Sequence, residues 1–215
     1  MLRKSRHAAQ ACIAAVIFLV AMGMAHAGEI VSDYTDLDPE GGCTWDSLDH
    51  LSEAEKEEML GNSAVCKGLP GYPVHFSEFD LRQYVAFGEV DEDGRVPGGF
   101  AQFNRTGAKI EWRIEDGEPV AAILRWYIEN PDPKTGETSK AMEGQVLVVS
   151  SVAQPGDGRG SCPVAYVDAR ENADANELAR KLADSLARDF VCGKDKPAWH
   201  GKRGPLSGSP VETVE

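Results

Sequence analysis

Four cysteines constrain the fold of this chain more than any other feature of its sequence. They are Cys43, Cys66, Cys162 and Cys192, and the fifth cysteine, Cys12, lies in a leader that we expect to be removed. The remaining even number predicts two disulfides in an oxidising compartment. No C-x-x-C pair occurs among them, and their spacings do not match zinc-binding or redox signatures. The sequence therefore predicts a disulfide-stabilised domain that needs no metal and no cofactor.

The segment before the last cysteine indicates how the cysteines pair. In "ADANELARKLADSLARDFVC" an apolar side chain recurs every four residues, which predicts an amphipathic helix with one buried stripe: Leu178, Leu182, Leu186 and Phe190. A helix of about 16 residues covers roughly 24 Å, close to the length of the strand and turn before it. We therefore predict a Cys162–Cys192 disulfide, with Cys43 bonded to Cys66.

The first 27 residues predict a secretory signal peptide. Three basic residues and no acid precede an apolar run that ends in the small-x-small sequence "AHA", Ala25 to Ala27. The run is shorter than the roughly 20 apolar residues of a membrane span, so we expect cleavage before Gly28 and no stable membrane anchor afterwards. Losing three positive charges changes the formal net charge from −13 to −16. So acidic a chain repels nucleic acid.

Six apolar runs separated by Gly, Pro and Asp predict the strands of an antiparallel sheet, at 72–79, 83–90, 108–114, 120–129, 145–152 and 162–169. Ser52 and Glu55 form a capping box for a short helix that ends near Leu60. Asp174 and Glu177 resemble a second capping box, and Gly193 a helix stop.

The order of these elements predicts an α+β fold. We expect an antiparallel β-sheet of about five or six strands with the C-terminal amphipathic helix packed on one face. The single disulfide-stabilised domain is expected to cover 43–193. An acidic flexible leader is expected at 28–42 and a disordered tail at 194–215, because both segments are polar or charged.

A hairpin around "EDGEP" predicts the first candidate surface. Pairing Ile114 with Val120, Trp112 with Ala122, Ile110 with Leu124 and Ala108 with Trp126 gives one continuous apolar face. The other face then carries Lys109, Glu111, Arg113, Ile123, Arg125 and Tyr127, with Glu111 and Arg125 within reach of an ion pair. Two interpretations stay open for Glu111, Arg113, Arg125 and Tyr127: a polar binding patch, or an ion-pair network that only fixes the register.

Two further segments carry candidate residues. "SEFDLRQY" places Asp80 and Arg82 at a turn, where a turn acceptor and a surface or interface arginine are expected. "YVDARENADAN" places several acids and asparagines where a helix start needs acceptors, which leaves Asp168 on the strand as the residue to explain. "DLDPEG", Asp36 to Gly41, resembles a calcium loop, but Pro39 interrupts it and Ser47 replaces the bidentate glutamate.

The sequence lacks the residue patterns of several common kinds of catalytic site. No G-x-S-x-G motif occurs, and the four cysteines are expected to be paired, so no serine or cysteine nucleophile is visible. His50, His75 and His200 lack the spacing of a catalytic zinc site. We identify no catalytic residue from the sequence.

Three longer motifs carry a family resemblance: "DLRQYVAFG", "KIEWRIEDGEPVAAILRWY" and "YVDARENADANELARKLAD". In this order they resemble a family of small exported proteins of alphaproteobacteria for which no activity is assigned. The resemblance covers roughly Cys66 to Cys192. It implies export and a single domain, and it carries over no activity, cofactor or catalytic residue.

The sequence thus predicts a periplasmic or secreted protein that acts as a non-enzymatic binding module. Its partner would be a protein or a small molecule of the cell envelope. One alternative is a hydrolase that uses a carboxylate such as Asp80 or Asp168, since both lie close to arginines. Another is an inhibitor of a basic envelope or host enzyme, because the rigid acidic scaffold would suit such a target.

Overall fold

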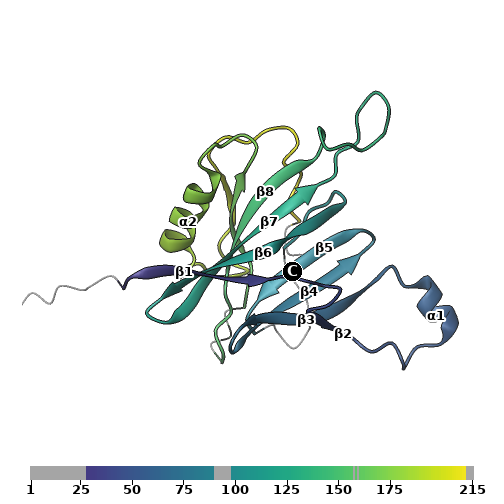
Figure 1. Ribbon diagram of the computed structural model, residues 1–215, viewed down its shortest axis with the longest axis horizontal. Helices are drawn as coiled ribbons and strands as arrows, with labels where there is room; N and C mark the ends of the chain where they lie inside the picture. Colours follow the sequence, from purple (N-terminus) through teal and green to yellow (C-terminus); the bar gives the residue numbers. More distant parts are fainter. Residues whose placement is uncertain (1–27, 90–97, 157, 159, 212–215) are drawn as a thin grey trace, which may run out of the picture.

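The computed structural model describes residues 28–89, 98–156, 158 and 160–211, so the predicted signal peptide lies outside the described residues. Two β-sheets and one longer helix form the molecule (Figure 1). The elements in chain order are β1 Ile30–Asp36, β2 Cys43–Trp45, α1 Glu53–Glu58, β3 Gly61–Leu69, β4 Tyr72–Phe79, β5 Arg82–Phe87, β6 Asn104–Glu115, β7 Glu118–Ile128, β8 Gly144–Ser151, β9 Pro163–Asp168, α2 Ala175–Leu186 and β10 Ala198–His200.

The two sheets pack face to face around the larger core. The six-stranded sheet has the order β1-β6-β7-β8-β9-β10, and the four-stranded sheet has the order β2-β3-β4-β5. Alternation along the strands turns Ile110 and Trp112 of β6 inward, where they meet Phe76 and Phe87 of the smaller sheet. Aromatic rings dominate this seam, and Phe87 packs edge-on against Trp112 with ring centroids 5.5 Å apart.

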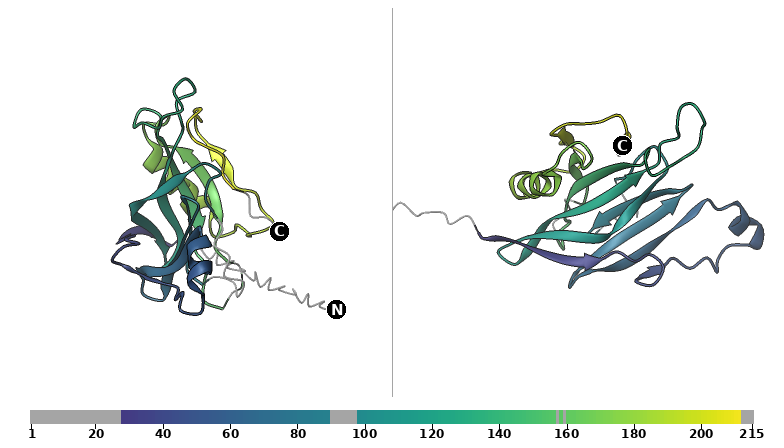
Figure 2. Two further views of the ribbon diagram at one scale, coloured as in Figure 1. Left: turned by 90° about the vertical axis from the view of Figure 1, so that its right-hand side faces the viewer. Right: turned by 45° about the horizontal axis from the view of Figure 1, so that its top comes forward.

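Helix α2 covers the outer face of the six-stranded sheet and makes a third layer (Figure 2). Its buried side chains are mostly alanines, which let the helix lie close to β7, β8 and β9. Leu182 is buried, and Leu178, Leu186 and Phe190 are partly buried against the same cluster. The predicted apolar stripe and its packing on one sheet face are therefore confirmed for the three leucines, whereas Phe190 lies beyond the end of α2.

Both predicted disulfides are present. Cys43 of β2 is bonded to Cys66 of β3, and Cys162, just before β9, is bonded to Cys192, beyond the end of α2. Their Cα atoms are 3.9 Å and 5.8 Å apart. The first bond lies within the smaller sheet, and the second ties the chain after α2 to the strand before it.

The prediction gave too few strands and one sheet instead of two, and the larger observed sheet is not entirely antiparallel. The described residues form ten strands in two sheets, and β10 pairs with β9 in parallel. The helix is not the last element, because β10 follows it. We missed β1, β2, β3 and β10 because they are short or rich in polar residues, so their sequence pattern is weak.

The expectations of a flexible leader and a disordered tail are wrong where the structure describes those segments. Residues 30–36 pair along β6 as β1. Residues 198–200 pair with β9, Ser207 is buried, and Pro210 forms an isolated bridge with Phe100. Backbone pairing compensates for the low apolar content of both segments, which composition alone did not reveal.

The β6–β7 hairpin keeps the predicted centre and changes at both ends. Trp112 pairs with Ala122 and Ile110 with Leu124, as predicted. Ile114 pairs with Pro119 rather than Val120, because the turn holds only Asp116 and Gly117, both with positive φ. Thr106 rather than Ala108 pairs with Trp126, because residues 107–109 form a bulge in β6.

The helix ends were predicted with mixed success. Ser52 and Glu55 form the expected capping box of α1, each side chain bonding the other residue's backbone. Asp174 is the N-cap of α2 but makes no side-chain capping hydrogen bond, so the second capping box is not formed. Helix α2 ends at Leu186, so Gly193 is not its stop. Within the residues described, no helix has both the length and the apolar character needed to cross a membrane.

Candidate functional site

A groove of about 760 Å³ opens at the end of the seam between the two sheets. The smaller sheet contributes Trp45, Phe76, Glu78 and Gln83, and the larger sheet contributes β6 from Arg105 onward. The remaining wall is the loop that carries the chain from β1 to β2. The lining residues are Asp36, Leu37, Asp38, Pro39, Glu40, Trp45, Phe76, Glu78, Gln83, Arg105, Thr106, Gly107 and Ala108.

The bulge in β6 lies along one wall of this groove. Three residues, 107–109, face a single residue of β7, so the strand kinks beside Thr106. Gln83 of β5 holds the bulge against the smaller sheet, since its Oε1 accepts from the backbone N–H of Thr106 at 2.6 Å. The Nε2 of the same side chain donates to Glu78 Oε2 at 2.6 Å. The two sheets are thus linked beside the opening.

Trp45 presents an aromatic surface at the groove. Its ring packs edge-on against Phe76, with centroids 5.8 Å apart, and its Nε1 donates to the carbonyl of Pro39 at 2.9 Å. These contacts fix the ring while 40% of the residue stays exposed. Because β2 is bonded through Cys43 to Cys66, the neighbouring disulfide holds this wall in place.

The groove is acidic. Four carboxylates line it against one arginine, and the guanidinium of Arg105 is 2.8 Å from Glu143 outside the groove. Among the described residues, only Asp36 of the four has a cationic partner, Lys109 at 2.5 Å. Asp38 instead accepts from the backbone of Glu40 and Gly41. A positively charged group would therefore be attracted to this site.

Asp38 also explains the calcium-like spacing of "DLDPEG". Its Oδ1 accepts from Glu40 N at 3.2 Å and from Gly41 N at 3.1 Å, which makes it the acceptor of a tight turn. Over the described part of the chain, no three His, Cys, Asp or Glu side chains converge into a group that could hold a metal ion.

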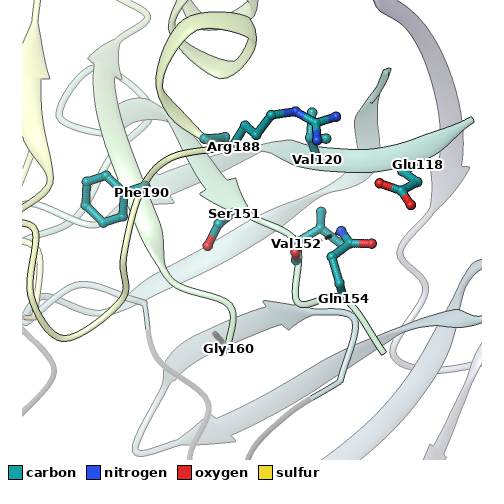
Figure 3. A pocket seen from close by; sticks show the side chains of 9 residues that line it. Glu118, Val120, Ser151, Val152, Gln154, Gly160, Arg188 and Phe190 are labelled. Atoms are coloured by element: carbon teal, nitrogen blue, oxygen red, sulfur yellow. Dashed lines mark hydrogen bonds between the residues drawn. The ribbon is translucent and has the colours of Figure 1, made fainter. Parts of the chain in front are cut away.

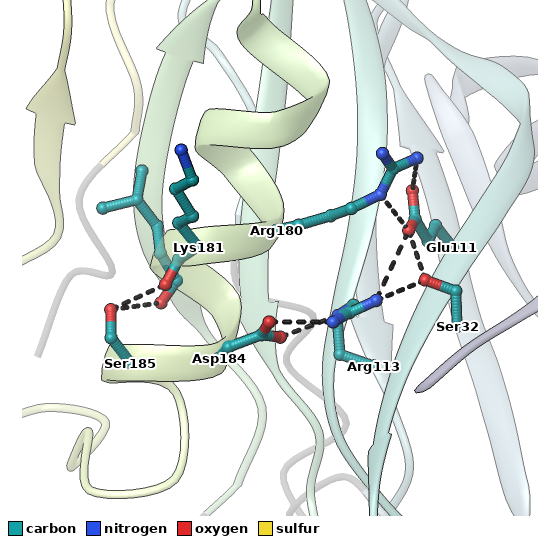
Figure 4. A network of polar contacts seen from close by, with 8 residues as sticks. Ser32, Glu111, Arg113, Arg180, Lys181, Asp184 and Ser185 are labelled. Atoms are coloured by element: carbon teal, nitrogen blue, oxygen red, sulfur yellow. Dashed lines mark hydrogen bonds and ion pairs between the residues drawn. The ribbon is translucent and has the colours of Figure 1, made fainter. Parts of the chain in front are cut away.

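Helix α2 divides the predicted polar patch. Glu111 and Arg113 lie buried beneath it in an ion-pair network (Figure 4). Glu111 accepts from Arg180 of α2 at 2.6 Å and from Ser32 of β1 at 2.6 Å, and Arg113 binds Asp184 of α2 through two bonds of 2.7 and 2.8 Å. Contrary to the prediction, Glu111 pairs with Arg180 and not with Arg125, because α2 supplies the nearer cation.

Burial and pairing act in opposite directions on Glu111. Burial alone would raise the pKa of its carboxyl, but hydrogen bonds from Arg180 and Ser32 outweigh that effect and leave the pKa below its usual value. The bond to Glu111 in turn raises the pKa of the Arg180 guanidinium. Both groups are therefore charged near neutral pH, and the network fastens α2 to β6 and β1.

The other half of the predicted patch stays outside α2. Arg125 donates to Gln145 at 3.1 Å and to Asn176, at the start of α2, at 3.5 Å. Tyr127 lies beneath the guanidinium of Arg105, 3.9 Å from the ring centroid. The structure therefore does not bring Glu111, Arg113, Arg125 and Tyr127 together into one open surface.

Asp80 and Arg82 lie at the tip of the β4–β5 hairpin, outside the groove. Arg82 pairs with Asp80, donates to the carbonyl of Ala101 at 2.8 Å and lies 4.7 Å over the ring of Phe103. Asp80 and Leu81 both have positive φ, of 49° and 58°, as a two-residue type I′ turn requires. This pair holds the turn and its neighbouring segment.

Asp168 is buried at the end of β9, where it accepts three backbone N–H bonds. Its Oδ1 accepts from Arg170 and Glu171, and its Oδ2 accepts from Gly204 at 2.9 Å. Asn172 adds two bonds to Lys202. The acids and asparagines of "YVDARENADAN" thus shape the joint before α2 and hold the C-terminal segment against it. Asp168 and Asp80 do not converge on the groove.

A second hollow lies between the end of α2 and the strands below it (Figure 3). Ser151, Gln154, Arg188 and Phe190 are among its lining residues. Its volume of about 30 Å³ is enough for a water molecule or two and excludes an organic ligand.

Sequence reasoning missed the groove, because its walls come from separate parts of the chain. Trp45 stands alone in a polar stretch, and Glu78 and Gln83 lie on opposite sides of a turn. The segments "DLDPEG" and "SEFDLRQY" supply its carboxylates, but the sequence did not indicate that these segments meet. Comparison of the chain with protein-family models, curated proteins and solved structures found no match. The resemblance to exported alphaproteobacterial proteins stays a prediction, and the site is interpreted from its own chemistry.

Proposed function

We propose that this protein is an exported, non-enzymatic binding protein that holds a positively charged group of its ligand in the groove between the sheets. The observation that carries the proposal is the groove's charge and shape. About 760 Å³ are lined by four carboxylates, of which Asp36 is paired to Lys109, by one arginine that is paired to Glu143, and by an exposed tryptophan. Cations interact favourably with carboxylates and with the face of an indole ring. The volume lies within the range of small-ligand sites.

Export is supported by the predicted leader and by the two disulfides, which persist in oxidising compartments such as the periplasm or the extracellular medium. A binding role is supported further by the positions of Asp80 and Asp168, the two carboxylates proposed for a hydrolase. One holds a turn and the other holds backbone N–H groups.

Isothermal titration calorimetry of the purified protein with arginine amide tests this function. We expect saturable binding that weakens as salt is raised, with glucose and glutarate giving no heat of binding. Trp45→Ala is expected to weaken binding about fivefold, the equivalent of roughly 1 kcal/mol for one cation–π contact. Trp45→Phe keeps an aromatic face and serves as the matched control.

Glu78→Gln separates charge from shape. A glutamine at this position can still accept from Gln83, so the wall of the groove is kept while one negative charge is lost. We expect weaker binding of arginine amide and an unchanged melting temperature. Binding of glucose in place of the cation, or equal affinity in all the variants, would rule out the proposed site.

A further inference from the structure

Four large apolar side chains are exposed at the tip of the β4–β5 hairpin and in the segments bonded to it. Leu60 is 72% exposed, Leu81 62%, Phe79 43% and Phe103 40%. Backbone contacts bring them together, because Asp80 N donates to Leu60 O at 2.9 Å and Asn104 N to Leu81 O at 3.1 Å. We call these four residues the apolar tip. Clusters of exposed apolar side chains mark interaction sites on soluble proteins.

The backbone conformation at position 81 does not favour a leucine. Both residues of this type I′ turn have positive φ, where glycine is the favoured second residue. The β6–β7 turn of the same chain has the same geometry and uses Asp116 and Gly117. Leu81 therefore keeps a large exposed side chain at a position that favours none, as strained residues at functional sites do.

The apolar tip adjoins acidic surfaces on both sides. The same hairpin contributes Glu78 and Gln83 to the groove. Leu60 ends an arm, residues 46–60, that projects beyond the sheets with α1 in it (Figure 1). This arm carries six acidic residues and one lysine, and no residue of α1 is buried. An apolar surface surrounded by acidic residues is complementary to a partner surface whose apolar residues are surrounded by basic residues.

We infer that the apolar tip docks a protein partner whose apolar side chains are flanked by lysines or arginines. The apolar residues lie on Leu60, Phe79, Leu81 and Phe103, and the basic residues reach the groove and the arm. This inference rests on the proposed function, since it takes the acidic groove as the place where the partner's cations bind. A second copy is disfavoured because it would bring two acidic arms together, and an anionic lipid surface is disfavoured for the same reason.

A displayed library of random twelve-residue peptides, panned on the immobilised protein, tests the inference. We expect enriched peptides to combine leucine, isoleucine or phenylalanine with lysine or arginine, and their binding to weaken from about 50 to 500 mM salt. Enrichment of neutral or acidic peptides, or no enrichment, would overturn the inference.

Leu81→Gly is the decisive variant. It removes the apolar side chain and also relieves the positive-φ strain, so it should raise the melting temperature by about 3 °C. We expect it to lower the affinity for an enriched peptide by about tenfold or more, as measured by fluorescence anisotropy. A more stable protein that binds less cannot be a folding defect. Val65→Ser, at a 44% exposed position of β3 away from the tip, is the matched control and should change affinity less than about twofold.

Further measurements separate the remaining outcomes. A dimer in sedimentation, or flotation with phosphatidylcholine vesicles, that Leu81→Gly abolishes would overturn the inference and assign the tip to a second copy or to lipid. Arginine amide reports on the groove alone. If it binds and no peptide depends on Leu81, the inference fails while the proposed function stands. If peptides depend on Leu81 but not on Trp45 or Glu78, the partner's cations do not bind in the groove and the inference is overturned in that part. The proposed groove function fails only if arginine amide does not bind.

Discussion

Trp112 of β6 and Trp126 of β7 are both buried in the core between the sheets, yet their indole N–H groups differ. Trp112 Nε1 donates to Thr35 of β1 at 2.8 Å. Trp126 Nε1 is buried and finds no acceptor among the residues that the structure describes. A buried donor without an acceptor lowers the free energy of unfolding, whereas a buried donor with an acceptor does not carry that cost. The two indole N–H groups therefore affect the stability of the same core differently.

We expect Trp112→Phe to lower the free energy of unfolding by about 1 kcal/mol more than Trp126→Phe. The first substitution loses a hydrogen bond and the second removes an unsatisfied donor, while both remove a similar volume. Urea denaturation of the two variants measures the difference. In a Thr35→Val background the gap should close, and a gap that persists there would show that the hydrogen bond is not its cause.

At the scale of elements, polar residues determine how α2 is attached. The apolar stripe of the helix is mostly alanine, which gives a close fit but little directional preference. The bonds from Arg180 to Glu111 and from Asp184 to Arg113 supply that preference, and Ser32 brings β1 into the same network. The network therefore sets the position of the helix along β6.

The depressed pKa of Glu111 makes this attachment sensitive to acid. Because the folded-state pKa lies below the unfolded value, the carboxylate stabilises the fold above the unfolded value of about 4.3. That stability is lost as the pH falls through the folded pKa. We expect Glu111→Gln to lower the free energy of unfolding by about 3 kcal/mol at pH 7. Below about pH 4.5, the stability of the variant should fall less steeply with pH than that of the unsubstituted protein. Thermal unfolding from pH 7 to pH 3 measures both, and a parallel decline in the variant would contradict the assignment.

Most elements of this fold were predictable, but the contacts between elements were not. Alternation located β4 through β9 and periodicity located α2, because these patterns are local. Glu111 meets Arg180 across 69 residues of sequence, so its partner was misidentified as Arg125. The bulge at 107–109 moved the register at Ala108 by two residues. Gly107 was the local sign of it, because a glycine inside a strand often marks a bulge, but it does not determine the new register. The groove, which depends on that bulge, was therefore not foreseen.

For the whole molecule, the two disulfides are expected to have separate roles. Each should contribute about 3 kcal/mol by restricting the unfolded chain. Replacing Cys43 and Cys66 with serine frees β2 and Trp45, so we expect binding of arginine amide to be lost or weakened. Replacing Cys162 and Cys192 should lower the melting temperature and leave that affinity unchanged. Loss of binding in both double variants would mean that the groove depends on global stability rather than on its own wall.

Neither disulfide crosses from one sheet to the other. Cys43–Cys66 lies within the smaller sheet, and Cys162–Cys192 joins the residue before β9 of the larger sheet to the segment after α2. The seam beside the groove is closed by aromatic packing and by the bonds of Gln83. No disulfide therefore fixes the spacing between the two sheets. If the groove binds ligands as proposed, a crosslink engineered across the seam is expected to fix the width of the groove and to narrow the range of ligands that it accepts.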